Sequence, residues 1–199
     1  MRLRPSGASG LLVSSLLAYQ RYQLQEAWTW EHQALVRARV VAGCPRLAAD
    51  YEALRSSVLQ LPRDEASLRD EVVKMRDKMR DHLLPAAVRE SEGGLFHLKH
   101  SSGGIVDIEF MVQFMVLAWG HAHPSLTRWS DNIRILESLA ESGLLNLADA
   151  EALTEAYKGY RASAHLLSLR REPLVVPDAQ FAVQRSMVCD IWRRLMQSP

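Results

Sequence analysis

The sequence contains only two cysteines, Cys44 and Cys189, which are far apart and have no Cys-x-x-Cys spacing. This excludes a disulfide framework and a cysteine-based zinc motif, and it is typical of free thiols in a reducing compartment. A chain of 199 residues does not need disulfides, because it can bury roughly 70% of the surface that its unfolded form exposes. We therefore expect a cytoplasmic protein.

Long hydrophobic runs and strong charge are also lacking. The longest apolar stretch, residues 110–119, is interrupted by Gln113 and is too short to span a bilayer. The first ten residues have no apolar core of signal-peptide length. Apolar residues make up 48% of the chain and charged residues 24%, and the net charge is +1. We therefore expect a soluble protein with no membrane and no nucleic-acid partner.

The common short motifs of catalysis and nucleotide binding are absent as well. The sequence contains no GxxxxGK[ST], GxGxxG, HExxH or GxSxG word, and these words mark the best-known phosphate, metal and nucleophile sites. His121 and His123 are only two residues apart. On a helix they would point about 200° away from each other and would chelate poorly. We therefore predict no metal site in this chain.

Helical periodicity runs through most of the sequence. It predicts helices that begin near Ser14 and cover about 28–42, 45–61, 64–83 and 147–170, with a last helix after Asp178. It also predicts a central helix from near Gly104 to about 121–124, and a helix capped by Ser130 that closes at Gly143. Leu95 and Phe96 lie between glycine pairs and are expected to be extended. The connections are short, so we predict a mainly α fold: an antiparallel bundle of about eight helices with a short extended N-terminal segment. In the 64–83 helix, the expected inward stripe is Leu68, Val72, Met75, Met79 and Leu83.

Residues 101–110, SSGGIVDIEF, place two carboxylates in an otherwise apolar run. Glycines at a helix start allow close approach of another chain or of a phosphate. Asp107 and Glu109 diverge by about 200° on a helix, so they cannot chelate one ion together. We predict that Glu109 forms a structural ion pair with Arg37 or Arg39. Asp107 is predicted to face a cleft, with Lys99 nearby.

Arg37 and Arg39 are of interest because they lie two apart in a predicted helix. They would point to different faces, so one of them would approach the buried side. A buried guanidinium needs a carboxylate or a phosphate. A structural salt bridge, for instance with Glu31 or Glu109, and a ligand contact remain open as alternatives.

Four long segments together indicate a family. They are MRLRPSGASGLLVSSLLAYQRYQ, AWTWEHQALVRARVVAG, FHLKHSSGGIVDIEFMVQFMVL and HPSLTRWSDNIRILESLAESGLL. In this order they resemble glutamine synthetase adenylyltransferase over nearly the whole chain, and residues 103–110 are similar to the C-terminal half of that bifunctional enzyme. The resemblance implies transfer of AMP from ATP, with magnesium, to a tyrosine of glutamine synthetase. The other half of the enzyme removes the AMP by phosphorolysis.

The resemblance also implies an organisation. Residues 1–43 would be the C-terminal remnant of a nucleotidyltransferase domain, whose residues 1–12 form a loosely held sheet edge, and residues 44–199 would be a helical domain. The residues implied to contact the nucleotide or line its cleft are Arg2, Arg4, Arg37, Arg39, Lys99, Gly103, Gly104 and Asp107. The expected partners are glutamine synthetase, the PII signalling protein and ATP.

One departure from the family bears on activity. Nucleotidyltransferases of this kind hold their magnesium ions with an Asp-x-Asp word, and no such word occurs in this sequence. We therefore expect no catalytic residue and no metal ligand in this chain, and no activity of the chain alone. The alternative is a non-catalytic module that docks glutamine synthetase or PII. A helical RNA-binding module is discouraged by the near-neutral charge.

Overall fold

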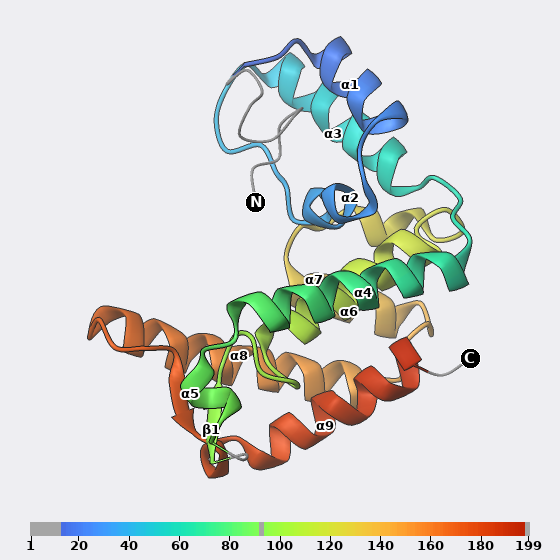
Figure 1. The fold of residues 1–199 in the computed structure, drawn as a ribbon. Helices are drawn as coiled ribbons and strands as arrows, with labels where there is room; N and C mark the ends of the chain where they lie inside the picture. Colours follow the sequence, from blue (N-terminus) through green and yellow to red (C-terminus); the bar gives the residue numbers. More distant parts are fainter. Residues whose placement is uncertain (1–12, 92–93, 198–199) are drawn as a thin grey trace. The chain divides into compact units, whose positions relative to one another are not determined.

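The computed structural model describes residues 13–91 and 94–197 (Figure 1). The fold is mainly α, as predicted: the described residues form nine α-helices and one two-stranded sheet. The chain divides into two compact units. The first contains the described residues up to Val72 together with Gln113–Ile135, and the second contains Val73–Val112 and the residues from Leu136 onward. The predicted division at residue 43 remains a prediction.

The first unit is built on α3 (Pro45–Leu59), against which α1 (Leu16–Gln25) and α2 (Thr29–Val36) pack. Local signals set the helix starts. The Ser15 hydroxyl accepts a hydrogen bond from the Ala18 amide at 3.2 Å, and Pro45 occupies the first turn of α3, where a missing amide proton costs nothing. The 3₁₀ turn η2 (Pro124–Thr127) and the start of α7 (Asn132–Glu141) complete this unit.

The second unit contains α5 (Ala86–Arg89), β1 (Leu95–His97), α8 (Leu147–Leu169), β2 (Val175–Pro177), the 3₁₀ turn η3 (Asp178–Gln180) and α9 (Ala182–Trp192). A π-helical turn, η4 (Arg193–Gln197), follows α9. The two strands are antiparallel, with Phe96 opposite Val176. Helices α8 and α9 pack antiparallel (Figure 1), and Arg194 after α9 pairs with Asp149 at the start of α8 at 2.7 Å.

Two long helices pass through both units. These are α4 (Glu65–Leu83) and α6 (Ile105–Trp119). Helix α6 is apolar around its whole circumference and is buried along most of its length, which is the pattern of a central core helix. Its Gln113 is also buried, and it accepts a hydrogen bond from the Gln33 side chain at 3.1 Å. That contact satisfies a polar group that would otherwise weaken the core.

Most helix boundaries agree with the sequence prediction. Helices α3, α4 and α8 begin and end within about two residues of the expected positions. Helix α6 begins where it was expected and ends at Trp119, somewhat before the expected end around 121–124. The predicted inward stripe of α4 is only partly correct: Leu68 and Val72 are buried, whereas Leu83 is 49% exposed. Met75 and Met79 are half-buried, so burial along the stripe decreases toward the C-terminal end of α4.

The prediction for the second helix was wrong at its end. The helix was expected to continue to about residue 42, but α2 ends at Val36. Its last carbonyl groups, those of Leu35 and Val36, accept hydrogen bonds from the distant Arg55 side chain. This partner replaces the next helical turn, and the chain from residue 38 to residue 41 has no helical structure.

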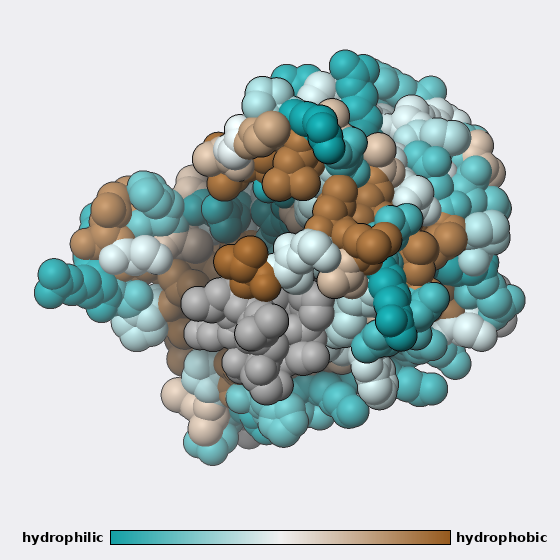
Figure 2. Space-filling model, turned by 90° about the horizontal axis from the view of Figure 1, so that it is seen from above, coloured by the Kyte–Doolittle hydropathy of each residue, from teal (hydrophilic) through white to brown (hydrophobic). Residues whose placement is uncertain are grey.

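An apolar groove lies on the first unit. It has a volume of about 650 Å³ and is lined by Tyr19, Val41, Leu47 and Tyr51 among others. Val41 is 82% exposed and Leu47 is 54% exposed. Figure 2, which views the molecule from above, shows hydrophobic side chains gathered on the face that carries α1 and α3.

Of the helices described, none combines the length and the apolar character needed to cross a membrane.

Candidate functional site

The turn before α6 is closed by its own backbone. The amide of Gly104 donates to the Ser101 carbonyl at 3.0 Å, and the amide of Ile105 donates to the Leu98 carbonyl at 2.9 Å. The amide of Gly103 donates to the Asp107 carboxylate at 2.6 Å. The first amide groups of this helix are therefore already bonded inside the protein, and they leave no open anion-binding end of the kind that phosphates use.

The two glycines of this turn serve close packing. Gly103 has a φ of +78°, in the left-handed region, and a Cβ atom there would lie 2.7 Å from the Arg185 carbonyl oxygen and 2.9 Å from the Cys189 Sγ atom. At Gly104 a Cβ atom would lie 2.9 Å from the carbonyl oxygens of Leu98 and Ser101. Only glycine fits at both positions, because α9 and the 98–101 turn occupy the space. Their predicted contact with a nucleotide has no support in this geometry.

Asp107 is buried and paired with Arg76. The Asp107 residue is 5% exposed and Arg76 is 1% exposed, and the Arg76 Nε atom donates to the Asp107 carboxylate. Burial raises the pKa of Asp107 above its ordinary value, while the Arg76 charge and the Gly103 amide act in the opposite direction. A charge inside a protein requires such a partner.

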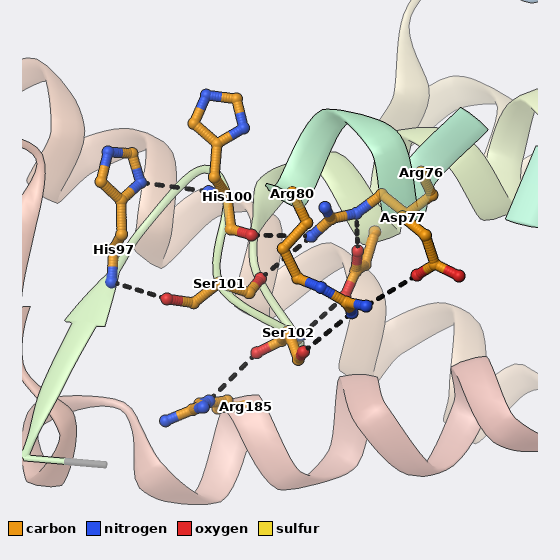
Figure 3. A network of polar contacts seen from close by, with 10 residues as sticks. Arg76, Asp77, Arg80, His97, His100, Ser101, Ser102 and Arg185 are labelled. Carbon is orange, nitrogen blue, oxygen red and sulfur yellow. Dashed lines mark hydrogen bonds and ion pairs between the residues drawn. The ribbon is translucent and has the colours of Figure 1, made fainter. Parts of the chain in front are cut away.

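Arg76 connects the same turn to α4. Its Nη2 atom donates to the carbonyl oxygens of His100 at 2.9 Å and Ser101 at 3.3 Å (Figure 3). The neighbouring Arg80 donates to the Ser102 hydroxyl at 3.4 Å, and Arg185 from α9 donates to the Ser102 carbonyl at 3.0 Å. Three arginines from two helices thus hold one short turn, and its role in this structure is to fasten α4, α6 and α9 together.

Two histidines lie in this turn with their rings 5.1 Å apart. The His97 Nδ1 atom accepts hydrogen bonds from the amides of Lys99 at 3.2 Å and His100 at 3.1 Å. These bonds require a neutral Nδ1 with the proton on Nε2. Burial, together with the charges of His97, Lys99 and Arg76, lowers the pKa of His100 to about 4. Both rings are therefore neutral near pH 7.

The predicted role of Asp107 in SSGGIVDIEF was wrong. Asp107 was expected to face a cleft with Lys99 nearby, but it is buried and paired with Arg76. Glu109 is half-buried and accepts a hydrogen bond from the Tyr157 hydroxyl at 3.3 Å. Asp107 faces inward because Gly103 and Arg76 both bind its carboxylate. The pairing of Glu109 with Arg37 or Arg39 remains a prediction.

The other predicted site residues are distributed over both units. Arg37 and Arg39 lie in the first unit and Lys99 in the second, and all three side chains are exposed. The expectation that Arg37 or Arg39 would approach the buried side was wrong, because α2 ends before both of them. Arg2 and Arg4 lie outside the described residues.

Sequence reasoning missed two arginines of the first unit, of which Arg55 is buried and Arg63 is half-buried. Arg55 is 2% exposed and donates to the carbonyls of Leu35, Val36, Thr127 and Trp129 at 2.5–3.2 Å. Arg63 donates to the carbonyls of Val58, Leu59, Leu61 and Leu117 at 2.9–3.3 Å. Burial lowers the pKa of Arg63 to about 10. Both residues cap helix ends, which attract cations, but arginines on amphipathic helices give no sequence signal for this role.

Comparison with known proteins identifies the family. The family model described as "Glutamate-ammonia ligase adenylyltransferase" matches residues 1–54, and the one described as "GlnD PII-uridylyltransferase" matches residues 70–197. Three relatives are each named "Bifunctional glutamine synthetase adenylyltransferase/adenylyl-removing enzyme". The Pseudomonas aeruginosa protein is 57% identical over 98% of this chain and 21% of its own length. The Acinetobacter baylyi and Pseudomonas putida proteins are each 53% identical over the same shares.

The chain belongs to the glutamine synthetase adenylyltransferase family. It spans about a fifth of the length of the curated relatives that it matches. These matches confirm the family that the four sequence segments indicated. The members of this family are nucleotidyltransferases.

The adenylyltransferase family implies ATP as substrate and a metal ion for the reaction. In residues 13–91 and 94–197, no three His, Cys, Asp or Glu side chains converge so that they could hold a metal ion. Asp107, which lies within the segment SSGGIVDIEF, already has its carboxylate bound by Arg76 and by the Gly103 amide. The described residues therefore do not fit a magnesium site.

Proposed function

We propose that this chain is part of an enzyme that transfers AMP from ATP to a tyrosine of glutamine synthetase, and that it corresponds to the C-terminal portion of the adenylylating half. The other half of such an enzyme would remove the AMP by phosphorolysis, so that together the two halves regulate nitrogen assimilation. The observation that carries this proposal is the 57% identity, over 98% of the chain, to a relative named for both activities. Magnesium would supply charge neutralisation on the phosphates when bound in the whole enzyme.

Within this enzyme, Arg37, Arg39 and Lys99 are the candidate contacts for the phosphates of ATP. Their side chains are exposed in the described structure. Guanidinium groups bind phosphate oxygens in a bidentate manner, and lysine acts as a point charge. Arg2 and Arg4 keep the same proposed role from the family resemblance. Asp107, Gly103 and Gly104 are no longer candidates, because their polar groups and their space are already used.

We further propose that the 199-residue chain does not transfer AMP by itself. Support comes from the sequence, which contains no Asp-x-Asp word, the word that holds magnesium in enzymes with this chemistry. A two-metal displacement loses its main source of charge stabilisation without those ligands.

The test is incubation of the chain with ATP, magnesium and glutamine synthetase, followed by mass spectrometry of the modified tyrosine. The full-length Pseudomonas aeruginosa relative serves as the positive control. We expect modification by the relative and none by the chain. Modification by the chain above background would overturn its proposed inactivity, and absence of modification by the relative would overturn the proposed reaction.

A second candidate function is a non-catalytic module that docks glutamine synthetase or the PII signalling protein. Residues 70–197 favour it, since the family model that matches them is described by PII uridylylation. Binding of purified PII to the chain, measured by calorimetry, tests this candidate. We expect no heat of binding if the chain serves the transfer reaction alone, and saturable binding if it is a PII-docking module.

A further inference from the structure

Trp129 carries two arginine side chains on its ring. The Arg128 guanidinium carbon lies 4.6 Å from the ring centroid, and the Arg134 carbon lies 5.0 Å from it. Both arginines are exposed and Trp129 is half-buried. Stacking on an indole ring restrains a guanidinium group, and the exposed Arg128 group keeps an N–H edge for an anion. We refer to Arg128, Trp129 and Arg134 as the stacked-arginine surface.

The backbone beneath this surface is held from both sides. Arg55 donates to the carbonyl of Thr127 at 2.6 Å and to that of Trp129 at 3.2 Å. On the other side, the Asp131 carboxylate caps α7 by accepting from the amides of Ile133 at 3.1 Å and Arg134 at 3.2 Å. The two cations are therefore presented on a fixed support, and little conformational freedom is lost when they bind a partner.

Arg128 gives this surface an exposed positive charge. Asp131 is the one acid within residues 127–135, and its carboxylate is committed to the start of α7. Among the residues that the structure describes, no hydrogen bond or ion pair of the Arg128 side chain is found; its contact is the Trp129 ring. The surface therefore fits an anionic partner.

The composition of this surface favours a protein partner. Tryptophan and arginine are the residues that most often dominate the binding energy of protein–protein interfaces.

The stacked-arginine surface also lies next to a proposed nucleotide contact. The Arg55 Nη2 atom donates both to the Val36 carbonyl at 2.5 Å and to the Trp129 carbonyl at 3.2 Å. One nitrogen atom thus joins the segment that leads directly into Arg37 to the segment that carries the surface. A protein bound there would lie beside the position at which Arg37 is proposed to meet the phosphates.

We propose that the stacked-arginine surface docks an acidic segment of the protein substrate. The identity of that substrate, glutamine synthetase, rests on the proposed function, whereas the acidic character of the segment follows from Arg128, Trp129 and Arg134 themselves. Docking at this point would supply the orientation that transfer to one particular tyrosine requires.

The experiment measures two interactions of the 199-residue chain. The first is with a fluorescent peptide of eight glutamates, followed by anisotropy, and the second is with immobilised glutamine synthetase. The test variant is R128Q/R134Q, and the matched control is R161Q/R170Q, which removes the same charge from two exposed arginines of the second unit. Thermal unfolding confirms that each variant is folded. Tripolyphosphate without magnesium is the competing small anion.

We expect R128Q/R134Q to weaken both interactions by roughly tenfold or more, since each removed charge pair has a modest value at an exposed site. The control should change them by less than about twofold. W129A should weaken them as well, and W129F, which keeps an aromatic ring, should retain most of the affinity.

Other outcomes separate the inference from the proposed function. Equal losses in the test and control variants, or no loss in either, would overturn the docking surface. Peptide binding that depends on the surface, without any binding of glutamine synthetase, would support the surface and overturn the named substrate. If only tripolyphosphate binding depends on Arg128 and Arg134, the surface is a phosphate site and the proposed acidic protein segment is wrong.

Discussion

The Asp107 carboxylate has no freedom left for a ligand, because Arg76 and the Gly103 amide both bind it. We expect the Asp107→Asn substitution to lower the free energy of unfolding by roughly 3–5 kcal/mol, since it leaves the buried Arg76 charge without its counterion. Urea denaturation of the chain measures this loss.

Glu109→Gln is the matched control for Asp107→Asn. Glu109 lies on the same helix but is half-buried, and it accepts a hydrogen bond from Tyr157 at 3.3 Å. Its substitution should cost about 1 kcal/mol. A larger loss for Glu109→Gln than for Asp107→Asn would restore the division of roles that the sequence predicted and contradict the one seen in the structure.

His100 should make stability depend on pH. Its pKa is lowered from 6.5 to about 4 by burial first, and then by the charges of His97, Lys99 and Arg76. The unfolded chain therefore binds more protons than the folded chain between these two values, and stability falls as the pH is lowered from about 6.5 to about 4. At about 1.4 kcal/mol per pKa unit, the loss amounts to roughly 2–4 kcal/mol.

The measurement is the free energy of unfolding at pH 7 and pH 5 for the wild type and for His100→Gln. The variant cannot titrate at this position, so its stability should fall less over the same range. Parallel losses in the two proteins would show that His100 does not carry the pH dependence.

At the scale of elements, Gly103 decides how closely α9 approaches the turn before α6. We expect Gly103→Ala to destabilise the chain for two reasons: its φ of +78° and the clash of a Cβ atom with the Arg185 carbonyl at 2.7 Å. Gly143→Ala is the control, because Gly143 has a φ of +68° but nothing within 4 Å of its Cβ position.

The control should therefore cost only the left-handed backbone strain, about 1–2 kcal/mol. The Gly103 substitution should cost clearly more, as seen in the melting temperature and in urea denaturation. Equal costs for the two variants would mean that α9 moves away easily and that its packing on the turn contributes little.

The sequence predicted those elements whose causes are local. Pro45 at the start of α3, Pro62 after its end and the 3.6-residue periodicity of α4 and α8 are enough to place these helices. The early end of α2 was missed because its cause is Arg55, about twenty residues away in the sequence. Strand β2 was missed for the same reason, since it forms by pairing with β1 across a long separation.

The site was less predictable than the fold. The sequence predicted a structural ion pair for Glu109 and a cleft position for Asp107. It missed the pair between Asp107 and Arg76, because the pattern of α4 is that of an amphipathic surface helix, which gives no sign of a buried arginine. The same limit hid Arg55, whose partners are backbone carbonyls that no sequence pattern marks. The family resemblance could not distinguish glycines that pack from glycines that bind phosphate.

At the scale of the whole molecule, a small net charge combines with an exposed apolar groove. The net charge is +1 at pH 7, which gives little electrostatic repulsion between copies. The groove along α1 and α3 exposes Val41 and Leu47, and exposed apolar patches of this kind promote association. We therefore expect the chain to bind a hydrophobic dye and to associate as its concentration rises, as measured by fluorescence and by sedimentation velocity.

The variant V41Q/L47Q should reduce both signals, because it places polar groups on the groove without touching the buried core. Leu166→Gln with Leu169→Gln is the matched control: these leucines are 55% and 68% exposed, but they lie on α8 and outside the groove. If association arises from the groove, only the first variant lowers it, whereas an equal reduction by both would show that scattered exposed leucines are responsible. A wild-type chain that remains monomeric and does not bind the dye would show that the groove is not accessible in solution.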